Sequence, residues 1–254
     1  MPLALPAAAV DLDALPMPQL TAMQQAGRRV HEACAVLAKT GDNVVGELLR
    51  HQGTFYEWDH YPTGDVYDGE THAQYYYHAH PAQTRGDEHG HFHTFLRPKG
   101  MPQGIKPLRV SDYKRPKDKN DALSHLIGIS MDRAGVPISL FTTNRWVTGE
   151  YWYRAPDVAA MLPAFEIGHA QPSWPVNIWI SNMIQLFQPH IAQLLALRDQ
   201  AVADWQRQHP KGNVYEDRVL EVTSTAAIDV DAHIAAVEQA LARRAAATAA
   251  TATA

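Results

Sequence analysis

Five histidines lie between positions 78 and 93, in the segments Tyr75-Tyr-Tyr-His78-Ala-His80 and Asp87-Glu-His89-Gly-His91-Phe-His93. Neutral imidazole binds Zn, Fe, Cu and Ni, and a catalytic metal site typically uses three protein ligands while leaving a position open for water or substrate. Two histidines separated by one residue on a strand supply two ligands from one rigid element. The cluster therefore predicts a divalent-metal site, with Zn or Fe as the leading ions and Cu, Mn or Ni as alternatives.

The histidine spacing of two residues equals the period of a β-strand, in which alternate side chains point to opposite faces. On that pattern His89, His91 and His93 share one face, while Phe92 and Leu96 share the other. The preceding segment places its own histidines on one side in the same way. If both apolar faces meet the core, the imidazoles gather on a single surface.

The connection between the two segments, Pro81–Glu88, is rich in turn formers and predicts an antiparallel hairpin. The expected cross-strand pairs are His80 with His89, His78 with His91, and Tyr76 with His93. Directly opposed Cβ atoms in such a pair are about 4.5 to 5.5 Å apart. Imidazoles at that separation can share a metal ion.

A second hairpin is predicted where the β-rich runs Ser124–Met131 and Val136–Asn144 flank the turn sequence Asp132-Arg-Ala-Gly135. The expected pairs are Met131 with Val136, Ile129 with Ile138, Ile127 with Leu140, and His125 with Thr142. This third segment brings one more histidine, His125, to the sheet.

The preferred set of metal ligands is His91, His93 and His125. The spacing leaves other sets open, in which His78 or His80 replaces His125, Glu88 joins as a carboxylate, or two metals bind. The competing interpretation is a patch of surface histidines that responds to pH. Two adjacent His-x-His strands and a third strand with a histidine favour the metal site.

Other polar side chains near these strands are candidates for catalysis or substrate binding. The candidates are His78 or His80 as proton shuttle or further ligand, Thr142 and Asn144 as orienting groups, Tyr76 as acid or base, and Arg97 and Arg145 as binders of a carboxylate or phosphate. Each has a structural alternative. Thr142 or Asn144 could cap the next helix, and the arginines could be ordinary surface residues.

These residues predict a metal-dependent enzyme: a hydrolase or lyase acting by hydrolysis or hydration if the ion is Zn, or an oxygenase with oxygen-dependent chemistry if it is Fe. The alternative is a non-enzymatic metal- or haem-binding module, or a subunit of a larger assembly that uses the Trp-rich region Trp146–Trp179. Glycine-rich nucleotide loops, kinase signatures and the Gly-x-Ser-x-Gly elbow of serine hydrolases are absent from the sequence.

The composition limits the partners. The chain of 254 residues has a formal net charge of −5 and a pI near 6.3, which argues against nucleic acid and an anionic membrane surface. No uncharged apolar run approaches the roughly 18 residues of a membrane span. A single cysteine, Cys34, is typical of a cytoplasmic protein. A small-molecule substrate is expected, and a protein partner or homo-oligomer is possible.

Around the histidines the sequence predicts an α+β fold, with a central antiparallel sheet of at least five strands and N- and C-terminal helices packed on it. The expected division is a flexible leader over 1–16, a single domain over 17–244 and a disordered Ala/Thr tail over 245–254. Helices are expected at Pro18–Lys39, from Asp42 to before Gly53, at Pro175–Gln208 with a break at Pro189, and at Asp229–Arg244; a last strand is expected at Arg218–Ala226.

The segments Gly90–Arg97, His125–Asp132 and Gly135–Glu150, taken together, resemble a bacterial protein family of unknown function. The resemblance spans about residues 45 to 210. It implies no activity, so the expected chemistry rests on the residues themselves.

Overall fold

The computed structural model describes residues 2–6, 9–81 and 86–252. Its strands are β1 (Leu3–Ala4), β2 (Tyr61–Tyr67), β3 (Ala73–His78), β4 (Glu88–Leu96), β5 (Ser124–Asp132), β6 (Pro137–Thr143) and β7 (Val222–Ala227). Within the described residues they form one seven-stranded sheet in the order β1-β7-β6-β5-β4-β3-β2. Neighbouring strands are antiparallel except β1, which runs parallel to β7.

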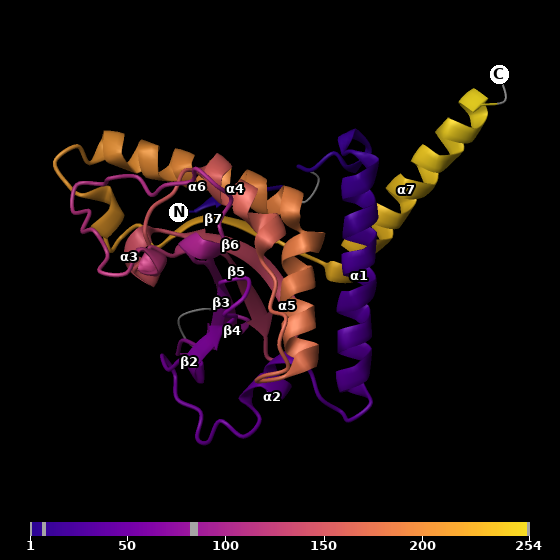
Figure 1. Ribbon diagram of the computed structural model, residues 1–254, viewed down its shortest axis with the longest axis horizontal. Coiled ribbons are helices and arrows are strands. Elements are labelled where there is room, and N and C mark those ends of the chain that lie inside the picture. Colours follow the sequence, from indigo (N-terminus) through magenta and orange to yellow (C-terminus); the bar gives the residue numbers. More distant parts are fainter. Residues whose placement is uncertain (1, 7–8, 82–85, 253–254) are drawn as a thin grey trace.

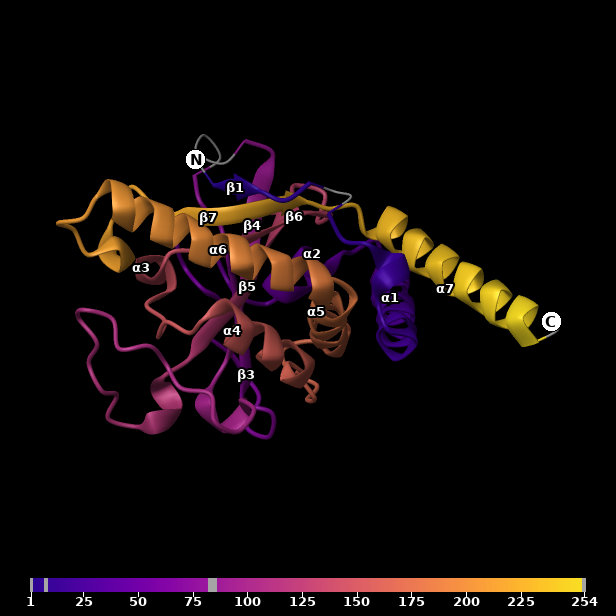
Figure 2. The ribbon, with the colours of Figure 1, turned by 90° about the horizontal axis from the view of Figure 1, so that it is seen from above.

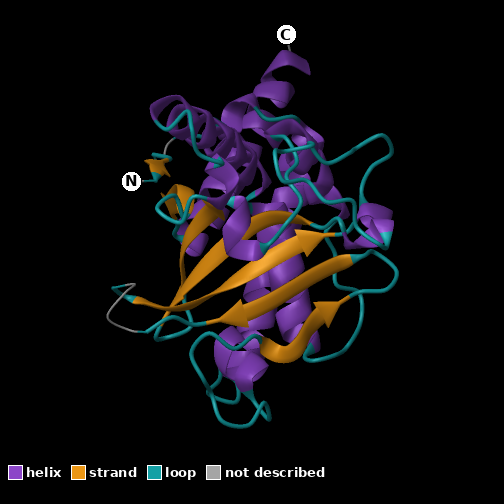
Figure 3. Cartoon of the chain, turned by 90° about the vertical axis from the view of Figure 1, so that its left-hand side faces the viewer, coloured by secondary structure: helices purple, strands orange, loops and turns teal. Residues whose placement is uncertain are grey.

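The helices are α1 (Met17–Ala38), α2 (Val44–Leu49), α3 (Arg145–Thr148), α4 (Ala155–Met161), α5 (Trp174–Leu186), α6 (Gln188–Gln208) and α7 (Val230–Ala252). The large helices lie behind the sheet in Figure 3, which leaves the face toward the viewer largely free of helices. In Figure 1, α1 lies beside α5 as an outer layer. The helix α7 begins next to α1 and extends away from the rest of the structure. Figure 2 shows the same projection from above. The predicted α+β class with N- and C-terminal helices is confirmed, although α1 packs mainly on α5 and α7 packs mainly on α1.

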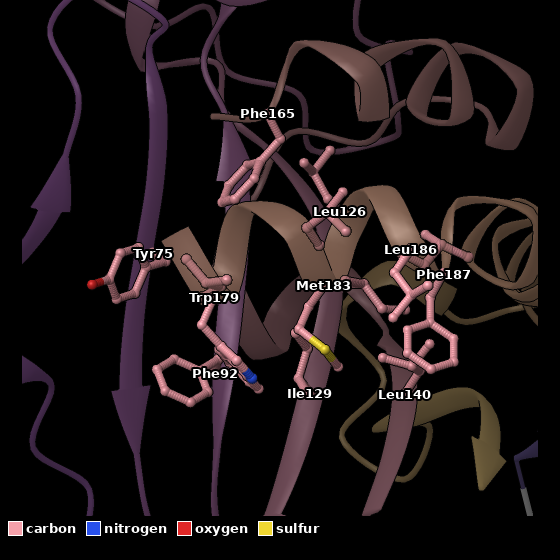
Figure 4. Packing of buried hydrophobic residues seen from close by; sticks show 14 of the residues in the cluster. Tyr75, Phe92, Leu126, Ile129, Leu140, Phe165, Trp179, Met183, Leu186 and Phe187 are labelled. Atoms are coloured by element: carbon pink, nitrogen blue, oxygen red, sulfur yellow. The ribbon is translucent and has the colours of Figure 1, made fainter. Parts of the chain in front are cut away.

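The core fills the space between the sheet and the helices (Figure 4). Trp179 of α5 packs on Phe92 of β4, with ring centroids 5.4 Å apart, and both side chains are buried. Met183 of the same helix and Ile129 of β5 belong to the same cluster. Burial of each such side chain contributes roughly 1.5 to 3 kcal/mol. The apolar face predicted for the histidine strands is therefore the face that holds the helices.

The first hairpin has the predicted register, because His78 pairs with His91 and Tyr76 pairs with His93. β3 ends at His78, so His80 follows the strand rather than pairing within it. Part of the predicted connecting turn, residues 82–85, lies outside the described residues.

The register of the second hairpin was predicted wrongly by two residues, since Ile129 pairs with Leu140 instead of Ile138. One step arises because the turn is closed by Asp132, whose backbone N–H donates to Val136 O at 2.8 Å. The second residue of the shift comes from an irregularity in the pairing between Met131, which pairs with Pro137, and Ser130, which pairs with Ser139. A shift of two residues preserves the face of every side chain, so the predicted core side of β5 survives.

The predicted long helix is divided as expected near Pro189, into α5 and α6. α2 is capped by Asn43, whose side chain accepts from the backbone N–H groups of Val45 and Gly46, rather than by Asp42. The strands β1 and β2 and the helix α4 were not predicted as such. Leu3–Ala4, in the expected leader, pairs with β7.

The C-terminal helix is longer than the composition suggested. α7 continues through Ala252, across most of the expected disordered tail, and positions 253–254 lie outside the described residues. Alanine is the strongest helix former, which accounts for helical continuation in this segment. No helix within the described ranges is long and apolar enough to cross a membrane.

Candidate metal centre

Histidines from β3, β4 and β5 share the sheet face opposite the helices. We call this the imidazole face and define it by His78, His91, His93 and His125. His78 closes β3, His91 lies directly opposite on β4, and His80 follows two residues after β3 ends. The ligand nitrogens of His78, His80 and His91 all lie within 4.8 Å of one another. Their ring centroids are 4.5 to 5.1 Å apart. These three histidines, the triad below, could hold a metal ion.

The triad differs from the preferred set of His91, His93 and His125, of which it retains only His91. His93 Nδ1 lies 3.0 Å from His125 Nε2, so these two imidazoles share a hydrogen bond. His125 Nδ1 lies 3.4 Å from the hydroxyl of Thr143. Because both nitrogens of His125 face neighbouring side chains, the structure places this residue behind the triad, as support for His93.

His125 reaches the imidazole face through a β-bulge. Thr94 pairs with Ile127, but the next residue, Phe95, pairs with His125, so Leu126 is an extra residue in β5. Strict alternation from the buried Ile127 would place His125 on the helix side. The bulge reverses the alternation, and Leu126 joins the core instead.

A second bulge removes His89 from the face on which it was predicted. Glu88 pairs with Asp132 and Gly90 with Met131, so two residues of β4 advance against one of β5. His89 turns to the other side, where its Nδ1 lies 2.6 Å from the hydroxyl of Tyr77. Glu88 takes the vacated position beside the triad.

Glu88 orients His91, the buried member of the triad. Its Oε1 lies 2.8 Å from His91 Nδ1, and the two side chains are 10% and 2% exposed. A carboxylate only accepts hydrogen bonds, so His91 donates through Nδ1 and keeps the lone pair of Nε2 for a metal. Hydrogen bonds of this kind fix the tautomer and ring orientation of metal-binding histidines. Glu88, weighed from sequence as a ligand, thus has the geometry of an orienting group.

Replacing Glu88 with alanine is expected to weaken metal binding about 10- to 100-fold, the usual cost of removing the carboxylate behind a histidine ligand. Competition with a chromophoric chelator would measure the affinity. Asp87→Ala is the matched control, because Asp87 carries the same charge one residue earlier and is exposed. An equal loss in both variants would mean that only the general charge matters, which would contradict the orienting role.

His93 is the most deeply buried imidazole of the group, with 0% exposure. Burial, with the neighbouring imidazoles, holds the pKa of His93 well below its usual range. Its Nε2 has no hydrogen-bond partner among the described residues. A buried polar atom without a partner costs about 1 to 3 kcal/mol. His93 lies 4.8 Å from His91 by ring centroids and belongs to the lining of the same cleft, so this unpartnered imidazole lies next to the triad.

Two buried groups near His93, the imidazole of His125 and the carboxyl of Glu150, are held in their uncharged forms. Burial, followed by the charge of Arg198, lowers the pKa of His125 to about 3. Burial raises the pKa of Glu150 to about 8, although its Oε2 accepts from the backbone N–H of His125 at 2.7 Å. Near pH 7 these buried residues therefore add little net charge to the site.

A cleft of about 910 Å³ extends from the triad over the open side of the sheet. Volumes of 300 to about 1,000 Å³ are usual for small-molecule sites. Phe141 stands edge-on to His91 at 5.1 Å between ring centroids. A side chain at Gly128 would collide with this ring, because a Cβ there would lie 2.3 Å from it. Gly128 therefore permits Phe141 to pack beside the triad.

Trp58 forms a wall of the cleft and was not among the predicted site residues. Its ring lies 4.2 Å from that of His80, edge to face, and the residue is 60% exposed. His60, from the same segment, stacks on Tyr76 with centroids 3.6 Å apart. Tyr76 thus lies on the predicted face, and burial raises the pKa of its hydroxyl. It borders the triad through His78 rather than the cleft.

The structure does not bring Thr142 or Asn144 to the triad. Thr142 Oγ1 lies 2.6 Å from Ser224 Oγ, and Ser224 donates to Leu194 O of α6, which places both hydroxyls on the helix side. Asn144 caps α3 by accepting from the backbone N–H of Arg145 and donates to Val214 O at 2.7 Å. The helix-capping alternative for Asn144 is confirmed.

The two arginines expected to bind an anion are engaged by protein groups and do not border the cleft. Arg145 pairs with Asp112 and Glu216. Arg97 donates to Gln74 Oε1 at 2.8 Å and pairs with Asp121 at 2.9 Å. Arg145 therefore ties the segments of Asp112 and Glu216 to α3, and Arg97 links Asp121 to Gln74 of β3.

Comparison with known proteins identifies a family for this chain but gives no activity for it. No curated protein and no solved structure matches the chain. One family model matches residues 24–228, which include the whole triad, Glu88 and the bulged segments of β4 and β5. The chain belongs to this family, which is described as "Domain of unknown function (DUF6969)".

Proposed function

We propose that this protein is a metal-dependent enzyme in which His78, His80 and His91 bind one divalent ion at the end of the cleft. The observation that carries the proposal is the convergence of three histidines whose ligand nitrogens lie within 4.8 Å of one another, with Glu88 hydrogen-bonded to His91. Three neutral nitrogen ligands are typical of catalytic sites, because they leave a coordination position for water or substrate.

The ion would supply one of two chemistries. Zn lowers the pKa of a bound water to about 7, which suits hydrolysis or hydration, whereas Fe(II) with open positions suits oxygen-dependent reactions. Neutral imidazoles suit both ions and also Cu and Ni, whereas Mn prefers carboxylate and water ligands and is the least suited of the five.

The chain's own residues would do the remaining work. The triad holds the ion, Glu88 holds the ring of His91, and the buried Nε2 of His93 offers a hydrogen bond at the metal end of the cleft. His93 and His125 share one proton along their 3.0 Å contact, so His93 can present Nε2 as donor or acceptor by exchange of tautomers. We assign His93 the role of proton shuttle that the sequence suggested for His78 or His80.

The test is metal loading of protein purified without a histidine tag. We expect one ion per chain after incubation with Zn(II), Fe(II) or Co(II). The visible spectrum of the Co(II) form is expected to change when azide is added, because azide can occupy an open position.

Two outcomes would count against the enzyme. Less than one ion per chain with each of Zn, Fe, Cu, Mn and Ni would overturn the metal site. A saturated Co(II) spectrum that azide leaves unchanged would instead identify a metal carrier, the non-enzymatic alternative. A cytoplasmic location, a small-molecule substrate and a single domain over 17–244 belong to the same proposal.

A further inference from the structure

The cleft is chemically divided along its length. At one end lie the triad, His93 and Glu88. At the other end, on the β7 side of the sheet, the borders are mostly apolar: Trp146, Val147, Trp205 and Val219–Val222, the last range including Glu221, with Thr225 as a further polar residue. Hydroxyl groups of Ser130, Ser139 and Thr143 line the stretch between the two ends. A ligand that fills the cleft would therefore meet imidazoles with one part and apolar side chains with another.

The charges that border the cleft are all acidic. Among the described residues, its border includes Glu88 and Glu221 but no lysine or arginine. Arg145, close in sequence to the apolar end, is already paired with Asp112 and Glu216. Arg218 stacks on Trp146, with its guanidinium carbon 4.5 Å from the ring centroid, and lies outside the border. An anionic group at the apolar end would be desolvated without a cation to pair with it.

We infer that the cleft binds an uncharged small molecule with an aromatic or aliphatic part, which lies against Trp146, Leu220 and Val222 while its polar group faces the triad. The assignment of the ligand's polar group as its reacting end rests on the proposed function. The preference for an uncharged, apolar ligand rests on the border of the cleft alone. The hydroxyls of Ser139 and Thr143 can each donate or accept, so they suit a neutral polar group between the two ends.

Two fluorescent dyes that differ by one anionic group test this inference. N-phenyl-1-naphthylamine is uncharged, and 8-anilino-1-naphthalenesulfonate is the same molecule with a sulfonate. Both would be titrated into metal-free protein at pH 8, above the ordinary pKa of imidazole. We expect the uncharged dye to bind about tenfold more tightly or better, and to quench tryptophan fluorescence by energy transfer. Equal or tighter binding of the sulfonate would overturn the inference.

A variant that fills the cleft locates the dye. Ser139 borders the cleft at a half-buried position of β6, so Ser139→Trp is expected to weaken binding of the uncharged dye about tenfold. Val136→Trp is the matched control, because Val136 belongs to the same hairpin, is 51% exposed and lies outside the border. Unchanged dye affinity in Ser139→Trp would place the dye elsewhere and overturn the inference.

Failure of this inference and failure of the proposed function give different results. Dye binding is measured without metal, and Zn stoichiometry is measured without dye, both on the unmodified chain. Stoichiometric Zn without preference for the uncharged dye would overturn the substrate class alone. Binding of the uncharged dye in the cleft without stoichiometric Zn would overturn the metal enzyme alone.

Discussion

Replacing His91 with alanine is expected to abolish stoichiometric metal binding and to lower Zn affinity by more than about 100-fold. His91 is the buried member of the triad and the one that Glu88 contacts, with its Nδ1 2.8 Å from Glu88 Oε1. Its loss leaves two ligands and removes the imidazole that Glu88 orients. Since removal of a supporting carboxylate alone costs about 10- to 100-fold, removal of the ligand should cost more. Isothermal titration with Zn(II) would measure the change.

His89→Ala is the control that separates a site from a histidine-rich tract. His89 lies two residues from His91, but the bulge in β4 turns it toward the hydroxyl of Tyr77, away from the triad. This variant is expected to bind one Zn ion with nearly unchanged affinity. If His89→Ala lost as much affinity as His91→Ala, the triad would not be the metal site.

Replacing Glu150 with glutamine is expected to flatten the dependence of folding stability on pH. Burial raises the pKa of Glu150 to about 8 from an ordinary 4.5. Between these values the folded chain keeps a proton that the unfolded chain releases. The free energy of unfolding must therefore fall as pH rises through this window, by about 1.4 kcal/mol for each pH unit from this group. Glutamine cannot ionise, so its contribution does not change with pH.

Urea unfolding of both proteins between pH 5 and 9 measures this difference. At pH 5 Glu150 is protonated and the two stabilities should be similar, whereas at pH 9 Glu150→Gln should be the more stable. Glu166→Gln is the control, because Glu166 is exposed and should leave the pH dependence unchanged. Parallel stability curves for the native chain and Glu150→Gln would show that Glu150 is already ionised in the folded state.

Strand periodicity predicted the faces of the first hairpin because its two strands keep regular pairing from His78 and His91 onward. The same rule failed at His89, where one extra residue in β4 reverses the alternation. It failed in the opposite sense at His125, which reaches the imidazole face only because Leu126 is bulged. Bulges depend on how the neighbouring strand packs, and the side-chain pattern of one segment does not reveal them.

The strand pattern did not predict which histidines form the triad, because the position of His80 depends on chain segments outside the strands. His80 follows the end of β3, with its ring 5.1 Å from that of His91. The separate segment before β2 places Trp58 against His80, because the backbone N–H of Trp58 donates to Ala79 O at 2.9 Å and the rings of Trp58 and His80 are 4.2 Å apart. Sequence parity placed His80 on the correct side but did not distinguish it from His125. By contrast, the apolar stripe of α5 and the break near Pro189 depend on local chemistry, and both were predicted.

The coordination of a bound ion is the measurement that tests the central claim most directly. X-ray absorption of the Zn-loaded chain should show three imidazole nitrogens at about 2.0 to 2.1 Å and a further oxygen ligand. His89→Ala should give the same spectrum, and His91→Ala should lose it. A Zn environment of oxygen ligands alone, or one unchanged by His91→Ala, would contradict the assignment of His78, His80 and His91 as the metal site.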